Sequence, residues 1–242
     1  MTALQELRAG VDVETIYSAP FGAELLEIVR EARASDRTVL FVVSDDRRAQ
    51  AAAQIAEFYD PGLEILRLTA WDNLPYDRVS PTAAVASRRC AALAALAQDS
   101  EPKARLVITT SAAIAQRCAP KETLKDASLA LKPGQIIAQD TLDSFLIANG
   151  YTRVPTVRDR GEYAQRGGIV DIFAPGEPEP VRLDFFGDAL ESLRCFDPET
   201  QLSTRQLKSV EFSPVSEIFF TDEALSRFRT KFIETFGPPA GD

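Results

Sequence analysis

The sequence predicts an α/β protein in which a layer of parallel strands and helices is followed by a smaller α+β domain. Between residues 14 and 117, short apolar runs alternate with helical patterns, which is typical of a doubly wound parallel sheet. Between residues 161 and 198, three β-type runs are separated only by turns rich in Gly and Pro, which indicates an antiparallel meander. The length of 242 residues suits one large or two modest domains.

The first strand, turn and helix are expected at Glu14–Ala19, Pro20–Gly22 and Ala23–Ala34. This order is also the layout of a phosphate-binding loop, which needs two glycines, a lysine for the phosphate oxygens and a hydroxyl for magnesium. The segment SAPFGAELLE has a single glycine and no lysine, and it places Glu24 and Glu27 where they would repel a triphosphate. We therefore expect an ordinary turn here, with no nucleotide or other cofactor.

The alternation of strands and helices continues through the first half of the chain. The unbroken apolar run Thr38–Ser44 predicts a buried strand of a parallel sheet. Either Asp45 or Asp46 can cap the alanine-rich helix that follows, which should reach about Tyr59. The next expected elements are a strand at Glu64–Leu68, a helix at Thr82–Ala97, a strand at Arg105–Thr109 and a helix at Ser111–Arg117.

The loop Ala70–Pro81 holds the only tryptophan of the chain and follows a parallel strand, where ligands often bind. Trp71, Tyr76 and Arg78 could contact a partner or a nucleic acid. Alternatively, the two aromatic side chains fill the edge of the core while Asp77 and Arg78 pair at the surface. We favour the second interpretation.

The second half of the chain begins with a polar stretch at residues 121–127, which we interpret as a linker. A short strand at Ser128–Leu131 follows. Asp140 then occupies the capping position of a helix, with Asp143 at the position of a capping box and Gly150 as its left-handed end. The apolar side chains that share one face of this helix are Leu142, Phe145 and Leu146.

The three runs of the meander are expected at Ile169–Phe173, Val181–Phe186 and Glu191–Phe196. The middle run alternates, so that one face of its strand should be core and the other exposed. The inward residues are Val181, Leu183 and Phe185, and the outward ones Arg182, Asp184 and Phe186. A phenylalanine on the polar face of a strand favours a protein contact over simple exposure to water.

The C-terminal part contains a possible return strand at Val210–Phe212 and a capped helix at Asp222–Phe236. The stripe of Leu225, Phe228, Phe232 and Phe236 on this helix should need a covering surface, which we expect the first layer to supply. The expected domain boundaries are therefore 1–120 for the first layer, 121–213 for the α+β domain and 214–242 for a segment that returns to the first layer.

The charge of the chain argues against a free-standing DNA-binding protein. The net charge is −9 and the isoelectric point is near 4.8, whereas a duplex-DNA binder usually shows a basic stripe. The isolated pairs Arg47–Arg48 and Arg88–Arg89 are expected to be solvated helix faces. Acidic chains of this kind more often meet basic protein surfaces.

The composition also excludes several kinds of catalytic and metal site. The chain has no histidine, which removes the commonest general base and the commonest metal ligand. Cys90, Cys118 and Cys195 form no Cys-x-x-Cys pair, and we expect them to be small buried side chains in a reducing compartment. There is no secretory signal and no apolar run that could cross a membrane, so the expected location is the cytoplasm.

Two segments carry a resemblance to a known family. The string RGGIVDIFAPGEPEPVRLDFFGDALESLRCFDPETQ resembles the second domain of the UvrB-like module that begins the bacterial transcription-repair coupling factors (Mfd), and LPYDRVSP resembles a signature of the preceding domain. The resemblance runs from about residue 10 to the C-terminus. It implies a degenerate helicase-like first layer (RecA/P-loop type) lacking a nucleotide site, with an inserted α+β UvrA-binding domain of the UvrB domain-2 type.

The resemblance also departs from UvrB itself. UvrB proteins insert a long tyrosine-rich hairpin near residues 70–90 to clamp damaged DNA, whereas this chain has only a short loop, as coupling factors do. In the family the chain continues well beyond the position of Asp242, so the sequence looks like part of a larger protein. The motor motifs of the family's ATP-dependent DNA translocase would lie beyond it, and the resemblance implies no catalysis here.

The function that the resemblance implies is recruitment of the damage sensor UvrA in transcription-coupled nucleotide excision repair. Carried over residue by residue, the family's docking positions fall on Arg166, Arg182 and Phe186. RNA polymerase and DNA would be contacted only through other parts of the full-length protein. The alternatives are a surface arginine pair with a phenylalanine covered inside the domain, a fragment of an ATP-dependent helicase or translocase, and a DNA-binding module that uses Arg153, Arg158 and Arg160.

Overall fold

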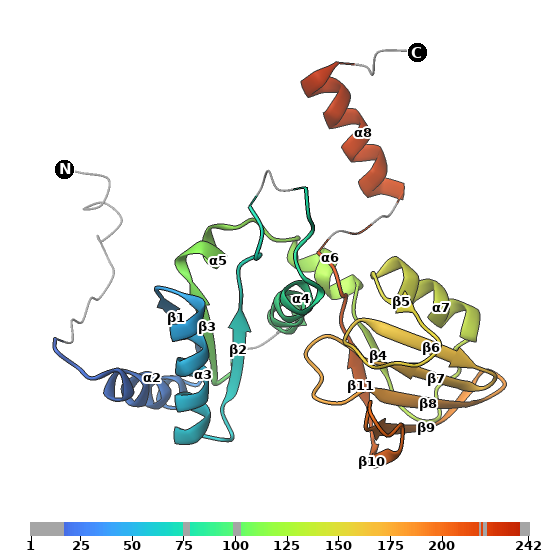
Figure 1. Ribbon diagram of the computed structural model, residues 1–242, viewed down its shortest axis with the longest axis horizontal. Coiled ribbons are helices and arrows are strands. Elements are labelled where there is room, and N and C mark those ends of the chain that lie inside the picture. The colour runs from blue at the N-terminus through green and yellow to red at the C-terminus, as the bar shows by residue number, and fades with distance from the viewer. Residues whose placement is uncertain (1–16, 75–77, 99–102, 218, 220–221, 238–242) are drawn as a thin grey trace.

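The computed structural model describes residues 17–74, 78–98, 103–217, 219 and 222–237. Within them the strands form a three-stranded, a six-stranded and a two-stranded sheet. Figure 1 shows the three-stranded sheet and the six-stranded sheet on opposite sides of the molecule, with α4 and α6 between them. We call residues 21–115 the parallel layer and residues 129–212 the six-stranded region.

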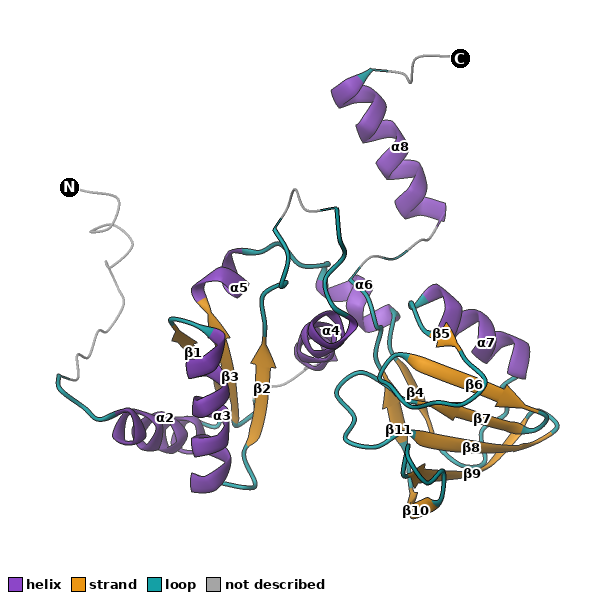
Figure 2. Ribbon diagram, in the orientation of Figure 1, coloured by secondary structure: helices purple, strands orange, loops and turns teal. Residues whose placement is uncertain are grey.

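The parallel layer has the strand order β1-β3-β2, and both strand pairs are parallel, as predicted. Helices α2 and α3 pack on one face, where their alanine and leucine side chains meet Leu106 and Ile108. Helix α4 contacts the edge strand β2 (Figure 2). The elements are α2 (Phe21–Ser35), β1 (Thr38–Val43), α3 (Asp46–Tyr59), β2 (Glu64–Leu68), α4 (Ala83–Gln98), β3 (Arg105–Thr110) and α5 (Ser111–Ala115).

Strand β1 is not buried on both faces, so this expectation was wrong. Val39, Phe41 and Val43 pack under α2 and α3, but Leu40 and Val42 are exposed. The reason is that β1 is an edge strand and only one of its faces is covered by the described helices. The central strand β3, which has a neighbour on each side, is buried along its whole length.

The ends of the first helices partly match the expectations. Asp45 caps α3 as predicted, because its Oδ1 accepts a hydrogen bond from the backbone nitrogen of Arg48 at 2.9 Å. Half of the predicted strand Glu14–Ala19 lies outside the described residues, and its described half, residues 17–19, is not a strand. This segment leads directly into α2, whose N-cap is Pro20.

The stretch that we interpreted as a linker is helical. Helix α6 (Lys121–Asp126) packs against α4, where Leu124 meets Leu93 and Ala97. Its polar side chains made it look like a connection, but the single buried leucine is enough to seat one face of so short a helix. The parallel layer and the six-stranded region are therefore joined by a packed element.

The six-stranded sheet has the order β10-β9-β8-β7-β6-β5 and contains the predicted meander. Its inner face packs on α7, whose Leu142 and Leu146 are buried as predicted. The return strand is also confirmed, since β11 pairs antiparallel with β4. The elements are β4 (Leu129–Leu131), α7 (Gln139–Ala148), β5 (Thr152–Arg153), β6 (Glu162–Arg166), β7 (Ile169–Ile172), β8 (Val181–Phe186), β9 (Ala189–Phe196), β10 (Ser203–Leu207) and β11 (Val210–Phe212).

The capping of α7 differs from the prediction. The N-cap is Ala138, without a side-chain hydrogen bond, and Asp140 lies within the first turn. Asp143 does not complete a capping box but accepts a hydrogen bond from the Tyr163 hydroxyl at 2.7 Å. The Asp143 carboxylate, which the local pattern assigned to the helix end, instead makes this long-range contact with β6. Gly150 has a φ of +85°, as expected for a left-handed helix end.

Helix α8 (Asp222–Phe236) has the predicted bounds, but its aromatic stripe is not covered by the parallel layer. Phe228, Phe232 and Phe236 are exposed and their rings lie against one another, with neighbouring ring centroids 5.9 and 5.0 Å apart. Figure 1 shows α8 extending away from both sheets. The hydrophobic pattern fixed which side chains align, but not which surface they meet.

The junction between the two regions contains a buried ion pair that the sequence did not indicate. Arg89, predicted to be solvated, is only 1% exposed, and its Nε donates to Glu217 Oε1 at 2.6 Å. Its Nη1 donates to the carbonyl of Thr69 at 2.9 Å, and the indole of Trp71 donates to Glu217 at 3.1 Å. Trp71 is 37% exposed and so does not fill the core edge as predicted, but its indole is tied to the junction by the bond to Glu217. Tyr76 and Asp77 lie outside the described residues.

The cysteines are unpaired and differ in exposure. Cys90 and Cys195 are buried as expected, and burial raises the pKa of the Cys90 thiol to about 12. Cys118 is exposed, which corrects the prediction for that residue. It lies in the loop between α5 and α6.

Candidate protein-docking site

The outer face of the six-stranded sheet carries the residues that the sequence singled out. The register pairs Asp171 of β7 with Arg182 of β8, and Arg182 with Arg194 of β9. Alternation along β8 buries Val181, Leu183 and Phe185 and turns Arg182, Asp184 and Phe186 outward, as predicted. The side-chain assignment to the two faces is therefore confirmed.

Arg182 and Arg166 meet at one buried carboxylate. Arg182 forms a two-pronged ion pair with Asp171, with its Nε 2.7 Å from Oδ1 and its Nη2 2.9 Å from Oδ2. Arg166, from β6, donates its Nη2 to the same Oδ2 at 2.9 Å. The hydrogen bond to Asp171 raises the pKa of the Arg182 guanidinium, against the opposing effect of burial. The structure thus brings two of the three predicted docking residues together.

Asp171 is the member of this site that sequence reasoning missed. Its side chain is fully buried, yet it is charged and stands on the outer face of the sheet. A signal existed, because an aspartate interrupts the apolar run Ile169–Phe173 at an outward position. Buried carboxylates are stable only when they are paired and hydrogen-bonded, and the two arginines supply both.

Arg182 is held from several sides, which leaves its side chain only 17% exposed. Its guanidinium carbon lies 4.7 Å from the centre of the Phe196 ring, and its Nη1 donates to the carbonyl of Gln201 at 3.4 Å. Phe196 belongs to a small buried cluster with Phe173, Ala164 and Val157. Arg182 therefore forms the border between this apolar cluster and the charged part of the face.

A second ion pair lies beside the first. Asp184 accepts hydrogen bonds from the Ser192 hydroxyl at 2.6 Å and from Arg194, whose Nε is 3.1 Å away. Burial acts to raise the pKa of Asp184, but the hydrogen bonds from Ser192 and Arg194 outweigh it and hold the pKa below its usual value. The carboxylate therefore stays ionised and fixes the side chains of β8 and β9 to each other.

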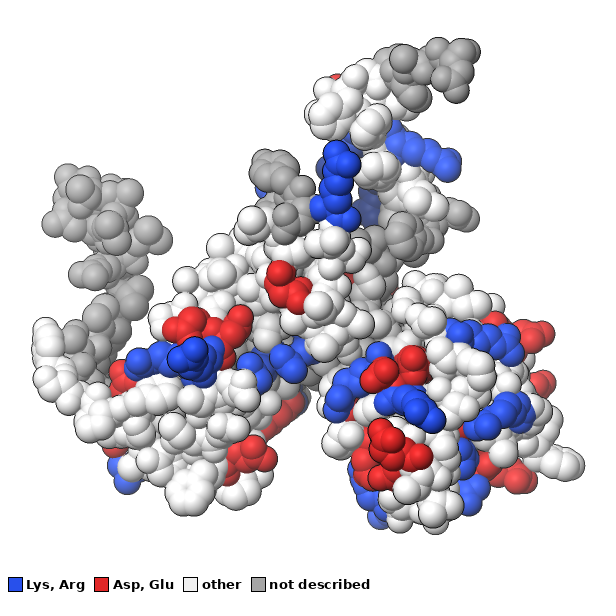
Figure 3. All heavy atoms as spheres, in the orientation of Figure 1, with Lys and Arg blue, Asp and Glu red and all other residues white. Residues whose placement is uncertain are grey.

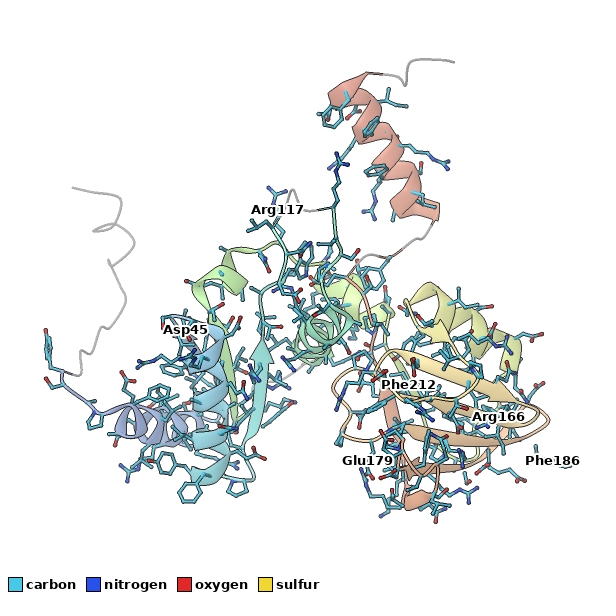
Figure 4. The ribbon with its side chains drawn as sticks, viewed as in Figure 1. Asp45, Arg117, Arg166, Glu179, Phe186 and Phe212 are labelled. Atoms are coloured by element: carbon cyan, nitrogen blue, oxygen red, sulfur yellow. The ribbon has the colours of Figure 1, made fainter. Side chains whose placement is uncertain are left out.

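The end of the sheet beyond these ion pairs exposes apolar side chains. Phe186 is 77% exposed, and Ile169, which faces Asp184 across the sheet, is partly exposed. Figure 4 shows Phe186 at the end of the six-stranded region that is farthest from the parallel layer, with Arg166 on the same side. Phe186 is not covered inside the domain, in contrast to the alternative interpretation. Arg166, Ile169 and Phe186 together form what we call the exposed patch.

The turn between Arg166 and Ile169, two members of this patch, requires glycine. A Cβ atom on Gly168 would lie 2.6 Å from the carbonyl oxygen of Phe185, and the backbone nitrogen of Phe185 donates to the Gly168 carbonyl at 2.7 Å. Gly167 has a φ of +59°, in the left-handed region. The close approach of the two backbones sets Arg166 and Ile169 beside the end of β8.

Other kinds of site have less support in the described part of the chain. No group of three or more His, Cys, Asp or Glu side chains that could hold a metal is found among the described residues. None of the described helices is long and apolar enough to span a bilayer. Figure 3 shows acidic and basic side chains intermixed on the viewed face of the six-stranded region. Of the arginines considered for DNA, Arg160 is held by the Glu177 carbonyl at 3.0 Å and by the Phe173 ring.

Comparison with known proteins places the outer face of the six-stranded sheet, our candidate docking face, inside a known domain type. Residues 129–218 match the family model described as the UvrB interaction domain. The transcription-repair-coupling factor of Myxococcus xanthus is 34% identical over 232 residues, which is 93% of this chain and 19% of that protein. The factor of Haemophilus influenzae is 32% identical over 216 residues, or 89% of this chain and 18% of that protein.

The same relationship extends to Escherichia coli K12, whose transcription-repair-coupling factor is 33% identical over 183 residues, covering 76% of this chain and 16% of that protein. The chain thus spans about a fifth of the length of the curated relatives that it matches. The predicted resemblance is confirmed, and Arg166, Asp171, Arg182 and Phe186 all lie within the matched domain.

Proposed function

We propose that this chain, a relative of the transcription-repair-coupling factors with a UvrB interaction domain at residues 129–218, recruits UvrA in transcription-coupled nucleotide excision repair. The observation that carries the proposal is the exposed patch, which presents Arg166 and Phe186 at the same end of the six-stranded sheet within that domain. An arginine next to an exposed aromatic side chain is the usual composition of an interface hot spot. Arg182, on the same face of β8 and on the side of Asp184 away from Phe186, completes the set of docking residues.

This role needs no catalysis by the chain itself. In the place of a phosphate-binding loop, α2 begins at Phe21, and Glu24 in its first turn pairs with Arg48 at 2.9 Å. We place the ATP-dependent translocation of DNA, and the contacts with RNA polymerase and DNA, in parts of the longer relatives that this chain does not match. A cytoplasmic location follows from the DNA repair in which the chain would act.

We further propose that the parallel layer is a degenerate helicase-like domain and that the six-stranded region is of the UvrB domain-2 type. The parallel order β1-β3-β2 supports the first part, and the family match supports the second. We keep the boundaries 1–120, 121–213 and 214–242. These boundaries fall next to the start of α6 at Lys121 and the end of β11 at Phe212.

The test is a calorimetric titration of UvrA from the same organism with this chain, which measures the dissociation constant. Phe186→Ala should weaken binding about thirtyfold, since truncation of a hot spot removes about 2 kcal/mol of binding free energy. The matched control is Phe58→Ala, which removes an equally exposed phenylalanine (81% exposed) from α3 in the parallel layer. It should leave binding unchanged. Equal affinities for wild type and Phe186→Ala would reject the proposed docking site.

A further inference from the structure

We propose that Asp171 and Arg182 are positioning residues for UvrA docking, and that Arg166 is the cation that they present to the partner. The inference rests on the proposed function and divides roles within the docking face. The two arginines then have different roles. Arg182 holds Asp171 in place, and Asp171 in turn holds Arg166.

The donors of Arg182 are directed into the protein. Its Nε and Nη2 both bond to Asp171, and its Nη1 reaches the carbonyl of Gln201. Its guanidinium also lies over the Phe196 ring. A side chain that is 17% exposed and engaged in this way has little surface left for a partner. Arg182 is therefore placed to fix its neighbours and not to make a new bidentate contact.

Arg166 has the opposite surroundings. Its side chain is 54% exposed, and its bond to Asp171 uses only Nη2. Within the part of the chain that the structure describes, its Nε and Nη1 make no hydrogen bond, and Nη2 uses only one of its two hydrogens on Asp171. Nη1 and the second hydrogen of Nη2 can therefore still form a fork of parallel donors on this exposed side chain. Arginine forks of this kind recognise carboxylates with two parallel hydrogen bonds.

Asp171 couples the two arginines because one oxygen serves both. Its Oδ2 accepts from Arg182 Nη2 and from Arg166 Nη2, each at 2.9 Å. On the neighbouring strand β6, Ala164 pairs with Asp171 and Arg166 lies two residues further along on the same face. An exposed arginine normally loses its side-chain freedom on binding, and holding it in place beforehand reduces that loss.

The arrangement also defines the kind of surface that fits it. Ile169 pairs with Arg166 across the turn, and Phe186 ends the neighbouring strand. The matching surface on UvrA is an apolar recess for the phenylalanine with a carboxylate at its rim for Arg166. Lysine at position 166 would supply charge without the fork and should bind less well.

A double-mutant cycle on the full chain separates positioning from direct contact. Asp171→Asn and Arg182→Gln should each weaken UvrA binding about fivefold in the wild-type background, a size expected for loss of one held side chain. In the Arg166→Ala background, neither substitution should weaken binding further, because the residue through which they act is gone. In the Phe186→Ala background, Asp171→Asn and Arg182→Gln should each still weaken UvrA binding about fivefold, because Arg166 is still present. Arg182→Lys, which keeps a charge beside Asp171, should restore most of the binding.

Each outcome decides a definite point. If Arg182→Gln weakens binding as much in the Arg166→Ala background as in the wild type, Arg182 contacts UvrA directly and the inference is overturned. If Arg166→Ala and Phe186→Ala leave binding unchanged, the proposed function itself fails. Circular dichroism checks that each variant is folded, and if Asp171→Asn is not, the Arg182→Gln cycle alone gives the decision.

Discussion

The Arg89–Glu217 pair at the junction and the Arg182–Asp171 pair on the docking face join the same chemical groups in different surroundings. Arg89 and Glu217 are 128 positions apart, and both side chains are almost fully buried. Arg182 and Asp171 are 11 positions apart on adjacent strands, and the carboxylate is shared with an exposed second arginine. The first pair connects distant segments, whereas the second connects the core of a sheet to its surface.

The comparison shows how the exposure of an ion pair determines the stability that is lost when one partner is removed. At the junction the remaining donors of Arg89 reach the backbone carbonyls of Thr69, Ala113 and Arg117, and both side chains of the pair are almost fully buried. On the docking face, Arg166 extends the pair into solvent. Removing one partner should therefore destabilise the junction more than the docking face, because a buried charge without a partner is expensive and an exposed one is not.

The largest expected effect comes from Glu217→Ala. This change leaves Arg89 buried with carbonyl partners only, and the free energy of unfolding should fall by about 3–5 kcal/mol. Urea unfolding followed by circular dichroism measures the loss. The control is Glu27→Ala, which breaks an exposed ion pair with Arg30 and should lower stability by no more than about 1 kcal/mol. Similar losses for both variants would show that burial does not set the difference.

A smaller effect is expected for Asp171→Ala. Both arginines lose their carboxylate, but Arg166 already faces water and Arg182 can turn part of its guanidinium outward. We expect the free energy of unfolding to fall by about 1–3 kcal/mol, as for the loss of hydrogen bonds to a charged group. The same urea titration applies. A loss larger than that of Glu217→Ala would contradict the ranking of the two clusters.

The smallest effect concerns pH and the neighbouring pair Asp184–Arg194. Because the pKa of Asp184 is lower in the folded protein than in the unfolded chain, its contribution to stability is present above the unfolded value of about 3.9 and is lost as pH falls through the folded value. The stability difference between wild type and Asp184→Asn should therefore shrink between about pH 5 and pH 3. A difference that grows over this range would mean that Asp184 is not stabilised in its charged form.

The sequence predicted the features of the docking face that depend on local order. Alternation along Val181–Phe186 assigned both faces of β8, because successive side chains of a strand point to opposite sides. The left-handed glycines marked turns and helix ends, and the resemblance led to Arg166, Arg182 and Phe186. Asp171 escaped notice, since its importance comes from a neighbour on the next strand and not from its own position.

The alternation of strands and helices, the meander and the outward side chains of β8 were determined by the sequence alone, since each follows from residue order within one segment. The tertiary structure decided which side chains are covered: it buried Arg89 against Glu217, exposed one face of β1, seated α6 on α4 and left the stripe of α8 uncovered. Burial and ion pairing depend on residues far away in the chain, and the energy of a charge depends on those neighbours. For that reason similar arginines lie in a buried junction at Arg89 and on an exposed, proposed docking face at Arg166.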